Sequence, residues 1–232
     1  MSTTDLYAQY GDARVLKGIS IHLDPGEVVT ILGANGAGKT TLLKVISGLI
    51  KPAKGKVVFR GEDIGARPAH EIRQMGLVHV PEGRGILGNL TVRENLFLGC
   101  YGAPPKEQAE RTEEIYARFP ILKEREKQLG GLLSGGEQTI LAIARGLVGK
   151  PHCILLDEPS LGIAPVMVDR IFEILQEMKK AQLPVLLVEQ NATQALEISD
   201  RSYVLEVGKV VAEGDMEKIL SNKRIVEAYL GL

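Results

Sequence analysis

The sequence lacks the features that mark membrane-spanning, secreted or disulfide-stabilised proteins. Its longest apolar runs, such as Val185–Val188, fall far short of the roughly 18 residues that a transmembrane helix needs, so we expect no membrane span. Residues 1–5 contain neither a basic nor an apolar segment, which predicts that no secretory signal is present and that the protein is cytosolic. The only cysteines, Cys100 and Cys153, lie far apart, and this predicts neither a disulfide framework nor a zinc site.

The charge balance gives no overall basic excess. Lys and Arg number 28 against 29 Asp and Glu, a formal net charge of -1, which argues against a dedicated nucleic-acid-binding protein. No internal repeat or low-complexity tract is present, and 232 residues fit one α/β domain. Glycine is the residue in excess, at 26 of the 232, which exceeds the usual share of about 7%. Some part of the chain therefore needs glycine.

Hydrophobic patterning divides the chain into three parts. The first and third alternate strand and helix patterns, which predicts an α/β fold with a largely parallel sheet over about 1–83 and 150–232. Between them, about 84–149, strand signals vanish and we expect a helical insert that begins with a capping box at Thr91. The predicted strands are 18–23, 27–32, 56–60, 76–80, 153–156 and 184–189, and the predicted helices are 39–49, 106–118, 135–148 and 165–180.

A glycine-rich segment follows the strand predicted at 27–32 and opens the helix that comes next. Residues 33–40 match G-x-x-x-x-G-K-[ST], the pattern of a phosphate-binding loop in its usual structural context. Its glycines let backbone N–H groups converge on phosphates, and the helix N-terminus adds a positive dipole. We expect Lys39 to reach the β- and γ-phosphates of a nucleotide and Thr40 to bind Mg²⁺. The sequence therefore predicts a nucleotide-binding protein.

Two adjacent acidic residues end the strand predicted at 153–156. Asp157 is placed to hold Mg²⁺ through a coordinated water, and Glu158 to orient or deprotonate a water that attacks the γ-phosphate. A solvated acidic turn is the alternative for such a pair alone, but the phosphate-binding loop upstream favours the catalytic interpretation.

The segment Leu133-Ser134-Gly135-Gly136-Glu137-Gln138 forms a second possible anion site. Ser134 and Glu137 have the spacing of a capping box, and the glycines leave N–H groups free at the helix N-terminus. Because the loop at 33–40 already serves the chain's own nucleotide, the expected guest is the nucleotide of a second chain. A simple capped helix is the alternative.

These motifs, in this order, resemble the ATP-binding subunits of ATP-binding cassette (ABC) transporters over almost the whole chain. The resemblance implies a P-loop NTPase fold of the ABC ATPase type, with a mixed sheet and a helical subdomain that carries the signature LSGGEQ. It implies that two cassettes sandwich two ATP molecules, and that Tyr10 stacks on adenine. The residues it assigns to ATP are Tyr10, Gly33, Ala34, Asn35, Gly36, Ala37, Gly38, Lys39, Thr40 and Thr41, and those assigned to the partner's ATP are Ser134, Gly135, Gly136 and Glu137.

The chain departs from the family pattern at three places. Glu82 stands where a glutamine usually contacts Mg²⁺. We expect its carboxylate to bind the ion in place of that glutamine and to add a negative charge beside the phosphates. Gln190 replaces the usual histidine; it can donate a hydrogen bond to the γ-phosphate but cannot carry a proton at physiological pH. Ser160-Leu161-Gly162, expected to touch the partner cassette, differs from the commoner form of that segment. The four histidines, His22, His70, His79 and His152, are expected to be structural or on the surface.

The departures narrow the resemblance to the shorter, LivF-type ATPase of branched-chain amino acid importers. It is carried by Val80–Arg84, Leu156–Pro165, Val188–Asn191 and the terminal Ala228-Tyr229-Leu230-Gly231. The resemblance implies ATP and Mg²⁺ as cofactors and attachment to the inner face of the cell membrane. The implied partners are a second, longer ATPase, two permeases and, indirectly, a solute-binding protein.

Several alternatives stay open. The chain could pair with itself in isolation, serve a related urea or amide importer, act outside transport as other ABC ATPases do, or bind nucleotide with little turnover because of Gln190. Gly83, Arg84 and Gly85 are candidates for contact with a permease, with an ordinary surface loop as the alternative.

Overall fold

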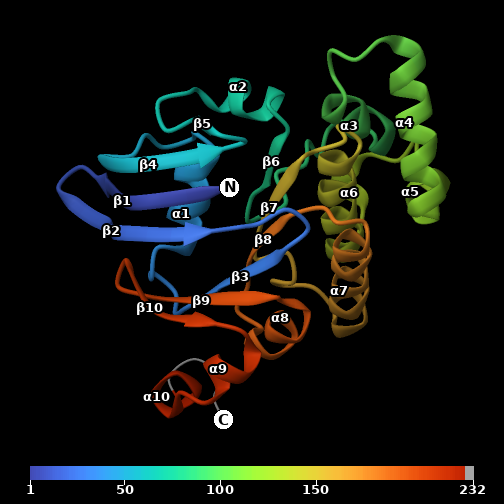
Figure 1. Ribbon diagram of the computed structural model, residues 1–232. Coiled ribbons are helices and arrows are strands. Elements are labelled where there is room, and N and C mark those ends of the chain that lie inside the picture. The colour runs from blue at the N-terminus through green and yellow to red at the C-terminus, as the bar shows by residue number, and fades with distance from the viewer. Residues whose placement is uncertain (228–232) are drawn as a thin grey trace.

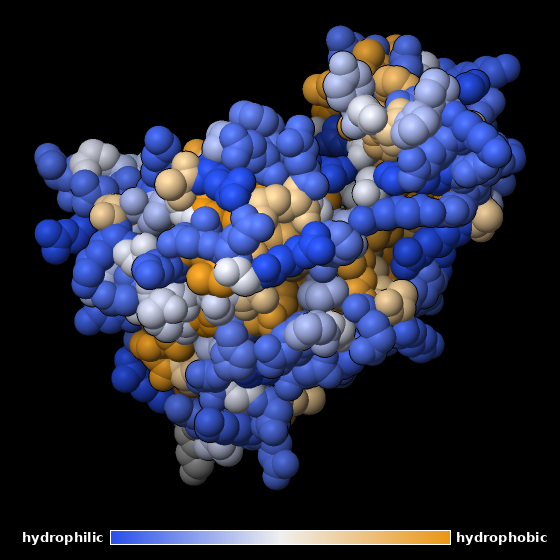
Figure 2. Space-filling view, turned by 45° about the horizontal axis from the view of Figure 1, so that its top comes forward, coloured by the Kyte–Doolittle hydropathy of each residue, from blue (hydrophilic) through white to orange (hydrophobic). Residues whose placement is uncertain are grey.

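The computed structural model describes residues 1–227, so the terminal stretch Ala228–Gly231 lies outside the described residues. Two sheets stacked around one helix form the body of the molecule, and a group of helices stands to one side of it (Figure 1). The face seen in Figure 2 is mostly hydrophilic, with hydrophobic side chains in separate patches. None of the helices in the described part of the chain is long and apolar enough to cross a membrane.

The central sheet has six strands in the order β10-β9-β3-β8-β7-β6. All neighbouring strands are parallel except β10, which runs antiparallel to β9. The strands are β3 (Val28–Leu32), β6 (Leu77–Val80), β7 (Cys153–Asp157), β8 (Val185–Val188), β9 (Arg201–Glu206) and β10 (Lys209–Gly214). Because the parallel strands end at one edge, the loops after β3, β7 and β8 lie side by side there.

Both faces of this sheet are covered, which explains why its inner strands are continuously apolar. Side chains alternate between two hydrophobic clusters: Leu155 of β7 packs with α1 and the antiparallel sheet, while Leu156 packs with the helices on the other side. All residues of β3, β7 and β8 are buried. The helices are α1 (Lys39–Ile46), α2 (Ala69–Gln74), α7 (Pro165–Lys180), α8 (Ala192–Ile198), α9 (Met216–Leu220) and α10 (Lys223–Ile225).

The second sheet is antiparallel, with strand order β2-β1-β4-β5. Its strands are β1 (Ser2–Tyr10), β2 (Ala13–His22), β4 (Lys54–Phe59) and β5 (Glu62–Asp63). The apolar face of α1, which includes Leu42 and Ile46, packs between this sheet and the central one. The phosphate-binding loop that precedes α1 is therefore supported from both sides.

Residues 92–147 are helical throughout their regular elements, as the sequence predicts. They form α3 (Val92–Gly99), α4 (Pro105–Arg118), α5 (Pro120–Glu124), the 3₁₀ turn η1 (Gly130–Leu132) and α6 (Gly135–Leu147). Thr91 and Ser134 each cap a helix with the reciprocal bonds of a capping box, so both predicted starts are confirmed. The core of this region is joined to the central sheet through α6, which packs on β6.

The predicted α/β fold is confirmed, whereas some predicted bounds are wrong. Helix α1 ends at Ile46 rather than at 49, because Gly48 turns the chain at a positive φ of 74° and Leu49 N donates to the carbonyl of Lys44. Strand β2 begins at Ala13 rather than at 18. Strands β1, β5, β9 and β10 and helices α2, α8 and α9 were not predicted.

Candidate functional site

The loop from Gly33 to Gly38 connects β3 to α1 and has backbone conformations that require glycine. A Cβ at Gly33, where φ is 150°, would lie 2.3 Å from the carbonyl oxygen of Leu205. Gly38, at φ 106°, is the N-cap of α1, and no side chain caps that helix end. The first N–H groups of α1 therefore remain available to an anion, which the helix dipole favours.

Lys39 lies at the start of α1 and is almost completely buried. Its Nζ donates to the carbonyl of Gly33 at 2.8 Å and of Ala34 at 3.3 Å. It also lies 3.5 Å from Oε1 of Glu158, and the two side chains are only 5% and 7% exposed. Each charge in such a buried pair compensates the desolvation of the other.

Thr40 and Asp157 meet next to Lys39. The hydroxyl of Thr40 donates to Oδ1 of Asp157 at 3.2 Å, while Oδ2 of Asp157 is buried without a partner. Burial raises the pKa of Asp157 to about 6, with the nearby charges of Glu158 and Glu82 acting in the same direction. A hydroxyl oxygen and a carboxylate oxygen side by side, with the negative charges of Glu158 and Glu82 nearby, suit a hard divalent cation. Among the described residues no cluster of three or more His, Cys, Asp or Glu side chains is arranged to hold a metal.

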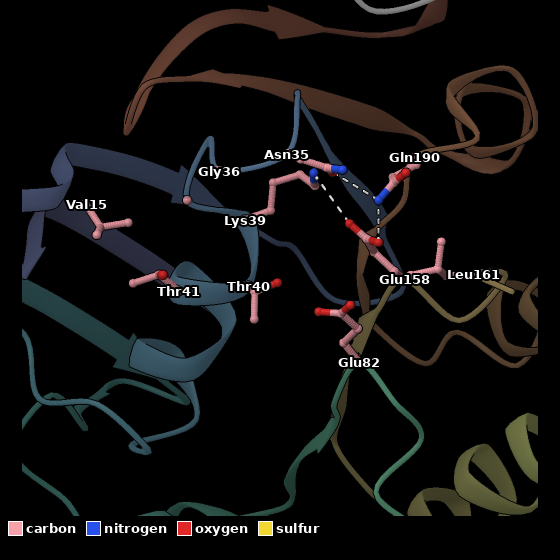
Figure 3. Close-up of a pocket in the computed structure, with 11 residues that line it drawn as sticks. Val15, Asn35, Gly36, Lys39, Thr40, Thr41, Glu82, Glu158, Leu161 and Gln190 are labelled. Atoms are coloured by element: carbon pink, nitrogen blue, oxygen red, sulfur yellow. Dashed lines mark hydrogen bonds and ion pairs between the residues drawn. The ribbon is translucent and has the colours of Figure 1, made fainter. Parts of the chain in front are cut away.

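A hydrogen-bonded bridge joins three loops at the edge of the central sheet (Figure 3). Nε2 of Gln190 donates to Oε2 of Glu158 at 2.7 Å and to Oδ1 of Asn35 at 3.1 Å. The strand order β3-β8-β7 causes this meeting, because Asn35 follows β3, Gln190 follows β8 and Glu158 follows β7. Glu158 itself has a positive φ of 49°, uncommon for a residue with a side chain, and strained positions of this kind concentrate at functional sites.

Lys39, Thr40, Asn35, Glu158 and Gln190 line one cavity of about 540 Å³. Asp157, a predicted site residue, does not line it but lines another cavity that shares Glu82 and Glu158 with the first. Glu82, two residues after the end of β6, points into the first cavity from the side opposite Asn35 (Figure 3). The residues that line the first cavity are Val15, Asn35, Gly36, Gly38, Lys39, Thr40, Thr41, Glu82, Glu158, Leu161 and Gln190.

Not every predicted site residue lies at this cavity. Gly33, Ala34 and Ala37 belong to the loop but do not line it, and Tyr10, at the end of β1, is 49% exposed and outside the lining set. Val15 of β2 lines the cavity and was not predicted. Its position could not be read from the sequence, because it depends on how β2 packs beside α1.

The signature residues lie elsewhere in the chain. Ser134, Gly135, Gly136 and Glu137 form the N-terminus of α6 and contribute nothing to the cavity lining. Arg84 donates to Oε1 of Gln138 at 2.8 Å and so ties the loop after β6 to this helix. The phosphate-binding loop and the N-terminus of α6 are therefore separate within one chain. This separation is what we expect if each element contributes to a different nucleotide site.

A buried acid beside the bridge was not predicted. Glu189, the first residue after β8, is 1% exposed and accepts hydrogen bonds from Ser160 and from the backbone of Gln190. An acidic residue directly after an all-apolar strand is the only sequence signal that could have pointed to it.

One protein family and several known proteins match this chain over most of its length. A family model described as ABC transporter matches residues 16–161, more than half of the chain. The ATP-binding protein BraG of Pseudomonas aeruginosa, named for high-affinity branched-chain amino acid transport, is 43% identical over 96% of this chain and 95% of its own length. A probable branched-chain amino acid transport ATP-binding protein LivF of Archaeoglobus fulgidus is 34% identical over 100% and 99%. The lipopolysaccharide export ATP-binding protein LptB of Haemophilus influenzae is also 34% identical, over 100% and 97%.

A solved structure shares the whole fold. The crystal structure of an ATP-binding cassette of an ABC transporter in its ADP conformation superposes with a TM-score of 0.84 at 31% identity, covering 100% of this chain and 98% of that one.

Proposed function

The chain belongs to the ABC transporter family as one of its ATP-hydrolysing subunits, and from this premise we propose that it energises the uptake of branched-chain or other hydrophobic amino acids. The observation that carries the proposal is the convergence of Lys39, Thr40, Asp157, Glu158 and Gln190 at the carboxyl ends of β3, β7 and β8. These groups supply what phosphoryl transfer to water needs: phosphate donors, acidic ligands and an oriented base.

The phosphates bind at the loop from Gly33 to Thr41. Backbone N–H groups at the N-terminus of α1 surround them, and Lys39, now paired with Glu158 and two carbonyls, turns its charge to the β- and γ-phosphates. The adenine stacks on Tyr10, whose ring is half exposed at the end of β1. Val15, which lines the cavity whereas Tyr10 does not, adds an apolar contact.

Thr40, Asp157 and Glu82 are the residues that would hold Mg²⁺. The unpartnered Oδ2 of Asp157 and the negative charges around it fit this role. The ion, when bound, neutralises charge on the β- and γ-phosphates.

Glu158 accepts a proton from the attacking water. As the water oxygen bonds to the γ-phosphorus, the bond between that phosphorus and the β–γ bridging oxygen breaks, and ADP leaves with the bridging oxygen. Gln190 donates from its amide to Oε2 of Glu158 and holds the carboxylate in position. Because Gln190 does not titrate near neutrality, it orients groups and moves no proton.

The other half of each site comes from a second cassette. Ser134 to Glu137, capped and outside the chain's own cavity, bind the nucleotide held by the partner, and Ser160-Leu161-Gly162 contact that partner. We propose a heterodimer with a second ATP-binding subunit; pairing of two copies of this chain is the alternative for the isolated protein.

Two permeases complete the transporter, and the chain sits on them at the inner face of the membrane. Besides the loop at Gly83 to Gly85, a second cavity of about 650 Å³ between α2, α3 and α4 is suited to the contact, since exposed Tyr101 and the basic Arg73 and Arg111 line it. Higher identity to BraG than to LptB favours import of amino acids over lipopolysaccharide export. Urea and short amides are the second candidate substrate class.

The chemistry is tested with Glu158→Gln in the full-length chain. Loss of the base should lower ATP turnover by about 100-fold or more, while ATP binding stays within about twofold, because the amide keeps the shape of the side chain. Glu197→Gln, an exposed acid on α8, is the control. Equal turnover in the Glu158 variant and the unmodified protein would show that another group is the base.

The transport assignment is tested by affinity purification of the chain from gently solubilised membranes, followed by mass identification. Recovery of a distinct ATPase and two polytopic permeases supports it, and the solute-binding protein found with them identifies the substrate. Recovery with ribosomes or DNA, or from the cytosol alone, would exclude transport and leave the ATPase chemistry in place.

A further inference from the structure

Glu189 is the one acid of this site whose role the proposed mechanism does not use. It directly follows β8, the strand between β3 and β7, and its side chain is 1% exposed. A carboxylate so completely buried is costly unless several donors satisfy it.

Donors from two loops provide that compensation. Backbone N of Ser160 donates to Oε1 of Glu189 at 2.9 Å, and the hydroxyl of Ser160 donates to Oε2 at 2.7 Å. Backbone N of Gln190 donates to the same Oε2 at 3.1 Å. The two backbone N–H groups can only donate, so these contacts favour the ionised carboxylate, while burial acts in the opposite direction and raises the pKa of Glu189.

The two loops that Glu189 ties together carry the reacting machinery. Ser160 stands two residues after Glu158, and Gln190 is the residue that donates to Glu158 at 2.7 Å. Glu189 thus closes a ring in which the base and its orienting amide are fixed relative to each other through the backbone. Without it, nothing in the described contacts holds Ser160 to the loop after β8.

We propose that Glu189 is a positioning residue for hydrolysis: it sets the distance between Glu158 and Gln190 by holding Ser160 and the backbone of Gln190. The inference rests on the proposed role of Glu158 as the base. Because Ser160 begins the segment proposed to contact the partner cassette, the same contact lets that partner influence the geometry of the base.

The test compares Glu189→Gln and Ser160→Ala in the full-length chain, singly and together, with Mg²⁺-ATP as substrate. In Glu189→Gln one oxygen is replaced by an NH₂ group, which cannot accept a hydrogen bond, so the donors that face this position in the unmodified chain lose their acceptor. We expect kcat to fall about 10- to 100-fold, the scale of a small misplacement of a reacting group. KM and the Kd for ATP should stay within about twofold, since no contact to the nucleotide changes. Ser160→Ala should give a smaller loss of kcat alone.

The double variant separates positioning from a general loss of stability. If both residues act through one contact, Ser160→Ala should cost little more once Glu189 is already glutamine, whereas independent structural damage would multiply the two losses. Glu197→Gln is again the control. An unchanged kcat in Glu189→Gln, or a loss that follows the fraction of folded protein, overturns the inference; should that variant not fold, an unchanged kcat in Ser160→Ala does so.

Failure of this inference differs from failure of the proposed function. If Glu158→Gln abolishes turnover and Glu189→Gln does not lower it, only the positioning role is wrong. If Glu158→Gln itself turns over normally, the proposed base is wrong and the positioning role falls with it.

Discussion

Nε2 of Gln190 donates a 2.7 Å hydrogen bond to Oε2 of Glu158. Because the same nitrogen also lies 3.1 Å from Oδ1 of Asn35, the amide connects the phosphate-binding loop to the proposed base. An amide donor suits this position, since it stabilises the carboxylate without adding a group that titrates near neutrality.

This relationship predicts different effects for two substitutions of Gln190. Gln190→Ala removes the donor and should lower kcat for ATP hydrolysis about tenfold, the scale of a lost hydrogen bond to a charged group. Gln190→Glu should lower it further at pH 7.5, because it places a second carboxylate next to Glu158 and the two cannot both ionise without cost. Gln74→Ala, exposed on α2, is the control. Normal turnover in Gln190→Glu would contradict the donor role.

The phosphate-binding loop could be located from the sequence because its chemistry depends on local spacing. The eight consecutive residues from Gly33 to Thr40 carry the motif, and the apolar pattern on either side indicates the strand before it and the helix after it. The start and end of α7, Pro165 and Lys180, were predicted for the same reason: one amphipathic helix carries its own periodicity and its own N-terminal proline.

Other parts depend on contacts between distant segments. Strand β9 reads Arg-Ser-Tyr-Val-Leu-Glu, and its place in the central sheet depends on pairing with β3, some 170 residues earlier, as well as with its neighbour β10. Glu189 resembles any acid at the end of a strand until Ser160 is brought to it. Val15 likewise reaches the cavity only through the packing of β2. Sequence patterns show which residues are apolar or acidic, and tertiary pairing decides which of them meet.

The acid at position 82 predicts an unusual dependence of ATP affinity on Mg²⁺. Its charge helps to raise the pKa of Asp157, and its side chain lines the same cavity as Lys39 and Thr40 of the proposed phosphate site. Glu82→Gln should therefore tighten ATP binding in the presence of EDTA, by about two- to fivefold for a partly exposed charge. With Mg²⁺ present the two proteins should differ less, so the ratio of the two Kd values falls.

Titration of ATP with and without Mg²⁺ measures this ratio. Glu197→Gln, which removes an equal charge from the exposed face of α8, controls for net charge. A ratio that is the same in Glu82→Gln and the unmodified chain would show that residue 82 lies outside the field of the phosphates.

A half-buried histidine, His79, predicts a loss of stability in mild acid. His79 in β6 accepts or donates at 3.0 Å with the hydroxyl of Ser47, and its Nε2 is buried without a partner. Burial, with a smaller effect of Lys44, lowers the pKa of His79 from 6.5 to about 4. Between these values the unfolded chain takes up a proton that the folded chain does not, so the free energy of unfolding falls as pH falls and the loss is complete near pH 4.

Denaturant unfolding at pH 7.5 and pH 5 measures the effect. His79→Gln removes the titrating ring, so the drop in unfolding free energy between these two pH values should be smaller by about 2 kcal/mol than in the unmodified protein. His70→Gln, exposed on α2, is the matched control and should leave the drop as it is. An equal drop in the His79 variant would mean that this histidine is protonated in the folded protein.

The exposed aromatic residue at the end of α3 predicts where the permeases attach. Tyr101 is 78% exposed and meets Phe97 edge to face, with ring centroids 6.4 Å apart. Exposed aromatic residues and arginines are enriched in protein–protein interfaces, and Tyr101 lines one cavity with Arg73 and Arg111. Truncating such an aromatic residue usually costs more binding energy than changing its neighbours. Tyr101→Ala should therefore reduce the permease recovered with the chain from solubilised membranes by about tenfold, the scale of a lost anchor.

Val211→Ala gives this experiment its control. Val211 is 45% exposed on β10, at the opposite edge of the central sheet from β6, so it removes apolar surface without touching the cavity beside Tyr101. Equal losses of recovered permease in the two variants would indicate nonspecific hydrophobic association rather than a specific contact at Tyr101. A loss with Val211→Ala alone would move the attachment to the β10 edge, and since β10 pairs with β9 rather than with the helical region, the permease would then act on the cassette body without passing through α3.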